Sequence, residues 1–91
     1  MKLKFKNKSV TLKQTVRAFM LYENITEKTF NPQNVTDIIT FFYCILVCSA
    51  KDYTITMEEF LDYLDNHFEV LNEFNVWLTE TNTQQDALKK N

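Results

Sequence analysis

The most distinctive feature of the sequence is a run of apolar residues near its middle. Residues 38–48 read IITFFYCILVC, and only Thr40 among these eleven is polar. A surface helix is apolar along one stripe, whereas a helix that is apolar on all sides has to be covered on all sides. The run is shorter than the roughly 20 apolar residues of a membrane span, and Asp37 and Lys51 flank it. It therefore predicts a helix at the centre of a water-soluble domain or at an interface.

The residues before this run change from one periodicity to another. Residues 2–12 alternate lysines with apolar residues, which is typical of a short hairpin or an edge strand. From about residue 15 the apolar positions follow the helical period, and we expect this helix to end near Asn24. Residues 25–32 then form a connector, because Pro32 cannot continue a helix and disfavours helical geometry at Asn31.

The apolar run belongs to a second predicted helix. Asn34 can cap its first turn, and Asp37 is favourable near the positive end of the helix dipole. We expect this helix to continue to about Ala50, followed by a short linker over residues 51–55.

Two further helices are predicted after the linker. Thr56 and Glu59 have the spacing of a capping box, which starts a helix over residues 56–65. Asn66 and Glu69 repeat the capping signal, so we expect a kink near residues 65–67 and a helix over 67–78. Residues 79–91 are polar and are expected to fray.

These elements predict a single, mainly α domain over residues 1–91. It comprises a short N-terminal β strand or hairpin (1–13), a helical core (14–78) of about four helices around the central apolar helix, and a polar tail (79–91). The three flanking amphipathic helices each offer one apolar face, and three such faces are enough to wrap most of one central helix.

Side chains suited to catalysis or metal binding are sparse. Cys44 and Cys48 lie four apart and share a helix face, a spacing that metal ligands can have. A zinc site needs about four ligands, however, and His67 is the only other soft candidate. We therefore expect both cysteines to act as small buried apolar residues. With no glycine-rich loop and no nucleophile beside His67, we expect no enzymatic activity, metal or cofactor.

Charge is distributed unevenly along the chain, whose formal net charge is −2. Residues 1–17 contain six basic residues and no acid, whereas residues 18–88 contain all twelve acids and only two lysines. The lysines near the N-terminus are able to contact phosphates, but the acidic remainder argues against a nucleic acid partner. One alternative is a solvated basic edge beside solvated acidic helices. The other is two complementary surfaces that join copies head to tail.

Three stretches taken together resemble a known family. Residues 12–30 (LKQTVRAFMLYENITEKTF), 41–52 (FFYCILVCSAKD) and 56–65 (TMEEFLDYLD) occur in the same order as in the tail assembly chaperones of long-tailed bacteriophages of Gram-positive bacteria. The opening KLKFK is also similar to that family's basic start. The chain departs from the pattern at Glu27, where the family often has glycine, and near His67, where it often has proline.

The resemblance implies a non-enzymatic role. Such proteins coat the long helical tape-measure protein in the host cytoplasm and keep it soluble until tail-tube subunits replace them, so they are not expected in the mature virion. They self-associate and are often made in a second, longer form by a ribosomal frameshift. Here Lys89 and Lys90 could be encoded by the A-rich codons that such a frameshift requires.

Two sets of residues are candidates for binding. The partner-binding candidates are aromatic residues in excess of those a small core needs: Phe19, Tyr22, Phe30, Tyr63, Phe68 and Trp77. The self-association candidates are the lysines of the β element and one side of the central helix: Lys2, Lys4, Lys6, Lys8, Tyr43 and Val47.

Two other functions are compatible with the sequence. A small phage-encoded regulatory or adaptor protein that binds one host protein would also work through its surface. A nucleic-acid-binding accessory protein would use the lysine strand. We expect no membrane partner.

Overall fold

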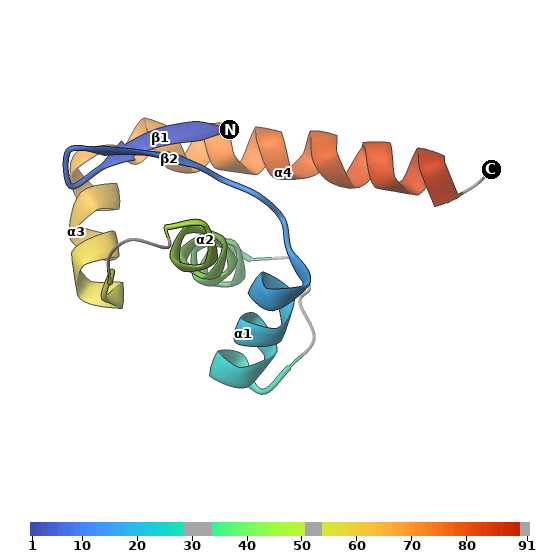
Figure 1. Ribbon diagram of the computed structural model, residues 1–91, viewed down its shortest axis with the longest axis horizontal. Coiled ribbons are helices and arrows are strands. Elements are labelled where there is room, and N and C mark those ends of the chain that lie inside the picture. The colour runs from blue at the N-terminus through green and yellow to red at the C-terminus, as the bar shows by residue number, and fades with distance from the viewer. Residues whose placement is uncertain (29–33, 51–53, 90–91) are drawn as a thin grey trace.

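The computed structural model describes residues 1–28, 34–50 and 54–89, with side chains up to Glu80 (Figure 1). The described chain forms two strands and four helices. These are β1 (Lys2–Phe5), β2 (Lys8–Thr11), α1 (Val16–Thr26), α2 (Val35–Ser49), α3 (Met57–Asn66) and α4 (Phe68–Lys89). The prediction of a mainly helical domain with a short N-terminal β element is confirmed.

The β element is an antiparallel hairpin. Leu3 pairs with Val10 and Phe5 with Lys8. The turn residues Lys6 and Asn7 have φ of 53° and 64°. Positive φ at both central residues is the geometry of a type I′ turn, which matches the twist of the two strands. Because the chain contains no glycine, residues with a Cβ adopt this conformation here.

Local hydrogen bonds at Thr15 and Glu27 set the two ends of helix α1. The Thr15 hydroxyl accepts a hydrogen bond from the Ala18 N–H, as an N-cap side chain does. At the other end Glu27 has φ of 59°, and its N–H donates to the Glu23 carbonyl. This left-handed conformation is a common helix ending that glycine usually occupies. Its apolar face buries Ala18 and Tyr22.

Helix α2 lies at the centre of the molecule and is seen nearly end-on between the other helices in Figure 1. Asn34 caps it by accepting from the Asp37 N–H at 2.9 Å. The interior-facing residues of the apolar run are fully buried: Phe41, Phe42, Cys44, Ile45 and Leu46. The prediction that this run forms the core helix is therefore confirmed.

Each flanking helix covers α2 with aromatic rings. Tyr22 of α1 meets Phe41 edge-on at 5.9 Å between ring centroids. From the other side, Phe60 of α3 meets Phe42 at 5.0 Å, and Phe74 of α4 stacks on Phe42 at 4.1 Å with ring planes 2° apart. The three helices therefore cover most of the central one within a single chain.

The break between α3 and α4 falls at His67, within the range expected from the sequence. The capping box of α3 is present, with Thr56 and Glu59 bonded reciprocally. The predicted second box is not observed, because the Asn66 side chain instead donates to the Asp62 carbonyl at 2.9 Å. Helix α4 also extends further than expected: it continues to Lys89, beyond the predicted end at residue 78. Residues 79–89 contain neither proline nor glycine to end the helix.

Candidate partner-binding groove

A groove lies between the N-terminal ends of α2 and α4. It encloses about 190 Å³ and is lined by Val35, Ile38, Phe68, Leu71, Asn72 and Asn75. Val35 and Phe68 are exposed over 61% and 73% of their surface, whereas most large apolar side chains of the chain are buried. The groove is therefore an apolar surface that the described chain leaves open to solvent.

Local structure explains why these side chains meet. Val35 and Phe68 are the first residues of their helices, so the start of α4 lies against the start of α2. Along α4 the lining residues follow the spacing i, i+3, i+4 and i+7, which places them in one row on its surface. Phe74, on the adjacent core-facing side, anchors α4 to Phe42 and so fixes the position of this row.

The partner-binding candidates from the sequence lie in different environments. Phe68 lines the groove, and Phe19 is 38% exposed on α1, where its ring also meets Phe41. Tyr63 and Trp77 are half-buried against the core. Phe30 lies outside the described residues.

Tyr22 is a correction to the sequence analysis, because its side chain has no exposed surface. Burial raises the pKa of its hydroxyl, and contact with the Asp37 carboxylate raises that pKa further. Asp37, itself only 6% exposed, pairs with Lys28 at 2.8 Å between Nζ and Oδ1. Hydrogen bonding to Lys28 lowers the pKa of Asp37. Tyr22 therefore helps to hold α1 against α2 and is not a surface residue.

A second apolar surface lies along α1, beside the face that packs on α2. Val16 and Met20 are exposed over 75% and 58% of their surface, and Phe19 lies beside them at helical spacing. This stripe is short, because Glu23 occupies the next position along it.

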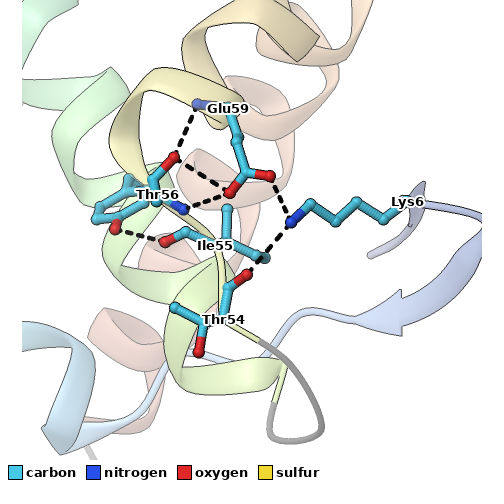
Figure 2. A network of polar contacts seen from close by, with 6 residues as sticks. Lys6, Thr54, Ile55, Thr56 and Glu59 are labelled. Carbon is cyan, nitrogen blue, oxygen red and sulfur yellow. Dashed lines mark hydrogen bonds and ion pairs between the residues drawn. The ribbon is translucent and has the colours of Figure 1, made fainter.

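The self-association candidates are only partly available. Lys6 forms an ion pair with Glu59 and donates to the Thr54 carbonyl at 3.4 Å (Figure 2). Lys2, Lys4 and Lys8 are exposed on the hairpin. Tyr43 and Val47 are half-buried, and the Tyr43 hydroxyl donates to the Ile55 carbonyl at 2.7 Å.

The two cysteines have the environment of structural thiols. Cys44 is fully buried and Cys48 half-buried, and both are free. Burial raises the pKa of Cys44 to about 11 and also raises that of Cys48. The raised pKa values favour the protonated thiol at both positions, and the thiolate is the form that acts as nucleophile and metal ligand.

Other features of the described residues bear on function. In the parts of the chain that the structure places, no three His, Cys, Asp or Glu side chains cluster as metal ligands would. None of the described helices has the length and apolarity that crossing a membrane requires.

Sequence reasoning missed most of the groove. It selected aromatic residues, and so it found Phe68 but not Val35, Ile38 or Leu71. The row from Phe68 to Asn75 was visible as an i, i+3, i+4, i+7 pattern. The contribution of α2 was not, because it depends on how the two helices cross.

The comparisons with known proteins provide no relative. No family model, no curated protein and no solved structure matches the chain.

Proposed function

We propose that the protein is a non-enzymatic tail assembly chaperone of a long-tailed bacteriophage, which binds and solubilises the tape-measure protein in the host cytoplasm. The observation that carries the proposal is the open groove between α2 and α4, with Val35 and Phe68 exposed on its walls. A soluble protein rarely leaves large apolar side chains together in a hollow unless another molecule covers them.

The shape of the groove suits a helical partner. An amphipathic helix binds by placing apolar side chains at i, i+3, i+4 and i+7 into a groove. The walls here are themselves two helices, so an incoming helix would pack against them as a third. Asn72 and Asn75 provide side-chain amides that are able to hydrogen-bond with polar groups flanking the partner's apolar stripe.

The backbone at Glu27 is compatible with the resemblance on which the proposal draws. Glycine is common at this position in the family, and Glu27 has the left-handed φ that glycine adopts at little cost. The departure from the family pattern therefore retains the backbone conformation that glycine favours.

Self-association belongs to the same proposal. A long helical partner offers many equivalent sites, so several copies would coat it side by side, together with any longer frameshifted form. The exposed Lys2 and Lys4 of the hairpin are available for contacts between copies, whereas Lys6 is already paired within the chain.

The proposal predicts a tape-measure gene beside this one, and co-expression with its product tests the proposal. We expect the tape-measure protein to be soluble with the wild-type chain and insoluble with the groove double variant Val35→Thr/Phe68→Gln. Leu61→Gln is the matched control, because Leu61 is an exposed apolar residue of α3 outside the groove. A tape-measure protein that is equally insoluble with and without the wild-type chain would overturn the proposal.

A further inference from the structure

We propose that the groove selects helices that carry lysine or arginine along one flank of their apolar stripe. This inference rests on the proposed function, because it assigns the chemistry of the segment that the groove binds. It follows from the charges that border the groove on α4.

A row of carboxylates runs along α4 beside the groove. Glu69 follows Phe68 in the chain, and Glu73 follows Asn72. With 3.6 residues per turn, Glu69 lies about 60° around the helix from Asn72. Three glutamates of this row are exposed: Glu69, Glu73 and Glu80. The two ion pairs of the described chain, Lys6–Glu59 and Lys28–Asp37, do not involve them.

The described side chains of α3 and α4 include no positive charge that offsets this row. Residues 57–80, which form α3 and the described side chains of α4, contain seven acids and no lysine or arginine. Among the described residues, Glu59 is the one of these acids that forms an ion pair, with Lys6. The nearest described basic residue to the α2 wall in sequence is Lys28, which is paired with Asp37. The open side of the groove is therefore negative, and complementary charge on an incoming helix is positive.

The described geometry favours a partner helix over a second copy of this chain. The exposed stripe of α1 has Val16, Phe19 and Met20 beside Arg17, so it offers part of the required pattern. Glu23 stands at the next position of that stripe, however, and would place a carboxylate against the acidic row. Like charges at an interface disfavour that pairing.

Two designed peptides test the charge preference. Both are about 18 residues long, or five helical turns, and share one leucine stripe. One carries lysines along a flank, and the other carries glutamates at the same positions. Fluorescence anisotropy with the full chain measures each affinity at about 0.02 M and about 0.5 M salt. We expect the lysine peptide to bind roughly tenfold more tightly at low salt, and this ratio to shrink at high salt.

Variants separate the local charge from the net charge of the chain. Glu69→Gln/Glu73→Gln/Glu80→Gln should remove most of the preference and retain binding. Glu27→Gln/Glu58→Gln/Asp62→Asn is the control, because it changes net charge equally, lies away from the row and leaves Glu23 in place, so it should keep the preference. The groove variant Val35→Thr/Phe68→Gln should weaken both peptides.

Each outcome decides between the two proposals. Equal binding of both peptides, still sensitive to the groove variant, would overturn the charge inference and leave the proposed function standing. Absence of binding by either peptide, or binding insensitive to the groove variant, would overturn both. If the mass of the chain by light scattering rises with concentration and Val16→Ser/Met20→Ser stops that rise, the occupant is a second copy and the charge inference is wrong.

Discussion

Lys6 in the turn of the hairpin pairs with Glu59 in the first turn of α3, across 53 positions of sequence (Figure 2). One Glu59 oxygen meets Lys6, while the other accepts from the Thr56 N–H at 3.0 Å. The same carboxylate therefore completes the capping box of α3 and links the hairpin to α3. Lys6 also has positive φ, so this tertiary contact stabilises an unusual backbone conformation.

The Lys6–Glu59 pair predicts a pH dependence of stability. Hydrogen bonding to Lys6 and Thr56 lowers the pKa of Glu59 from 4.5 to about 2. A carboxyl with a lowered pKa in the folded state contributes stability above its unfolded pKa and loses it as pH falls toward the folded one. Thermal unfolding followed by circular dichroism should therefore show a smaller loss of Tm between pH 5 and pH 2 in Glu59→Gln than in the wild type.

Glu58→Gln is the control for this experiment, because Glu58 lies on the same helical turn and has no ion pair in the described chain. It should follow the wild-type pH profile. An identical profile for Glu59→Gln would contradict the role assigned to the pair. Added salt should reduce the Glu59 effect, since both side chains are 40% exposed.

The left-handed residue at the end of α1 predicts a stabilising substitution. A residue with a Cβ pays about 1–2 kcal/mol in this conformation, and glycine loses about 0.5–1 kcal/mol more backbone entropy on folding. Glu27→Gly should therefore stabilise the fold by up to about 1 kcal/mol, or raise Tm by several degrees. Glu23→Gly, in the helix itself, should cost about 1 kcal/mol. Chemical denaturation measures both, and a loss of stability in Glu27→Gly would contradict the conformation described.

A buried amide offers a second route to higher stability. Both the oxygen and the nitrogen of the Gln14 side chain are shielded from solvent, and neither has a hydrogen-bonding partner among the described residues. A buried polar group without a partner costs about 1–3 kcal/mol. Gln14→Met keeps the length of the side chain and removes both polar atoms, so we expect a gain of about 1 kcal/mol in the free energy of unfolding. A loss of that size would show that the amide is satisfied in solution.

Two phenylalanines of α4 should contribute very differently to the stability of the fold. Phe74 is fully buried and stacked on Phe42, so Phe74→Ala should cost about 3–5 kcal/mol. Phe68 is 73% exposed, and Phe68→Ala should change stability by no more than about 0.5 kcal/mol. Urea denaturation distinguishes the two. A large loss of stability for Phe68→Ala would indicate that its ring supports the fold and is not reserved for a partner.

Several elements of the fold could be predicted because their causes lie within a few residues. The caps at Asn34 and Thr56 depend on side chains that reach backbone N–H groups three positions away. The alternation in residues 2–12 predicted the β element for the same reason. The extent of α4 was misjudged, because polar composition weakens a helix without ending it.

The candidate site was much less accessible to sequence reasoning. An aromatic residue at helical spacing is equally suited to a core and to a surface, and Tyr22 and Phe68 illustrate the two outcomes. Lysines spaced along a strand indicate an exposed face, but not that one of them will reach a helix far along the chain, as Lys6 does.

The sequence by itself determined that a helix apolar on all sides must be enclosed, because no surface of it tolerates water. It also determined where α2 and α3 start, since their caps are local. The tertiary structure decided which side chains complete that enclosure and which are left over. How α1, α3 and α4 cross α2 buried Tyr22 and Phe74 and left Val35 and Phe68 facing a groove. That choice depends on contacts between segments far apart in the chain, and periodicity within one segment does not encode it.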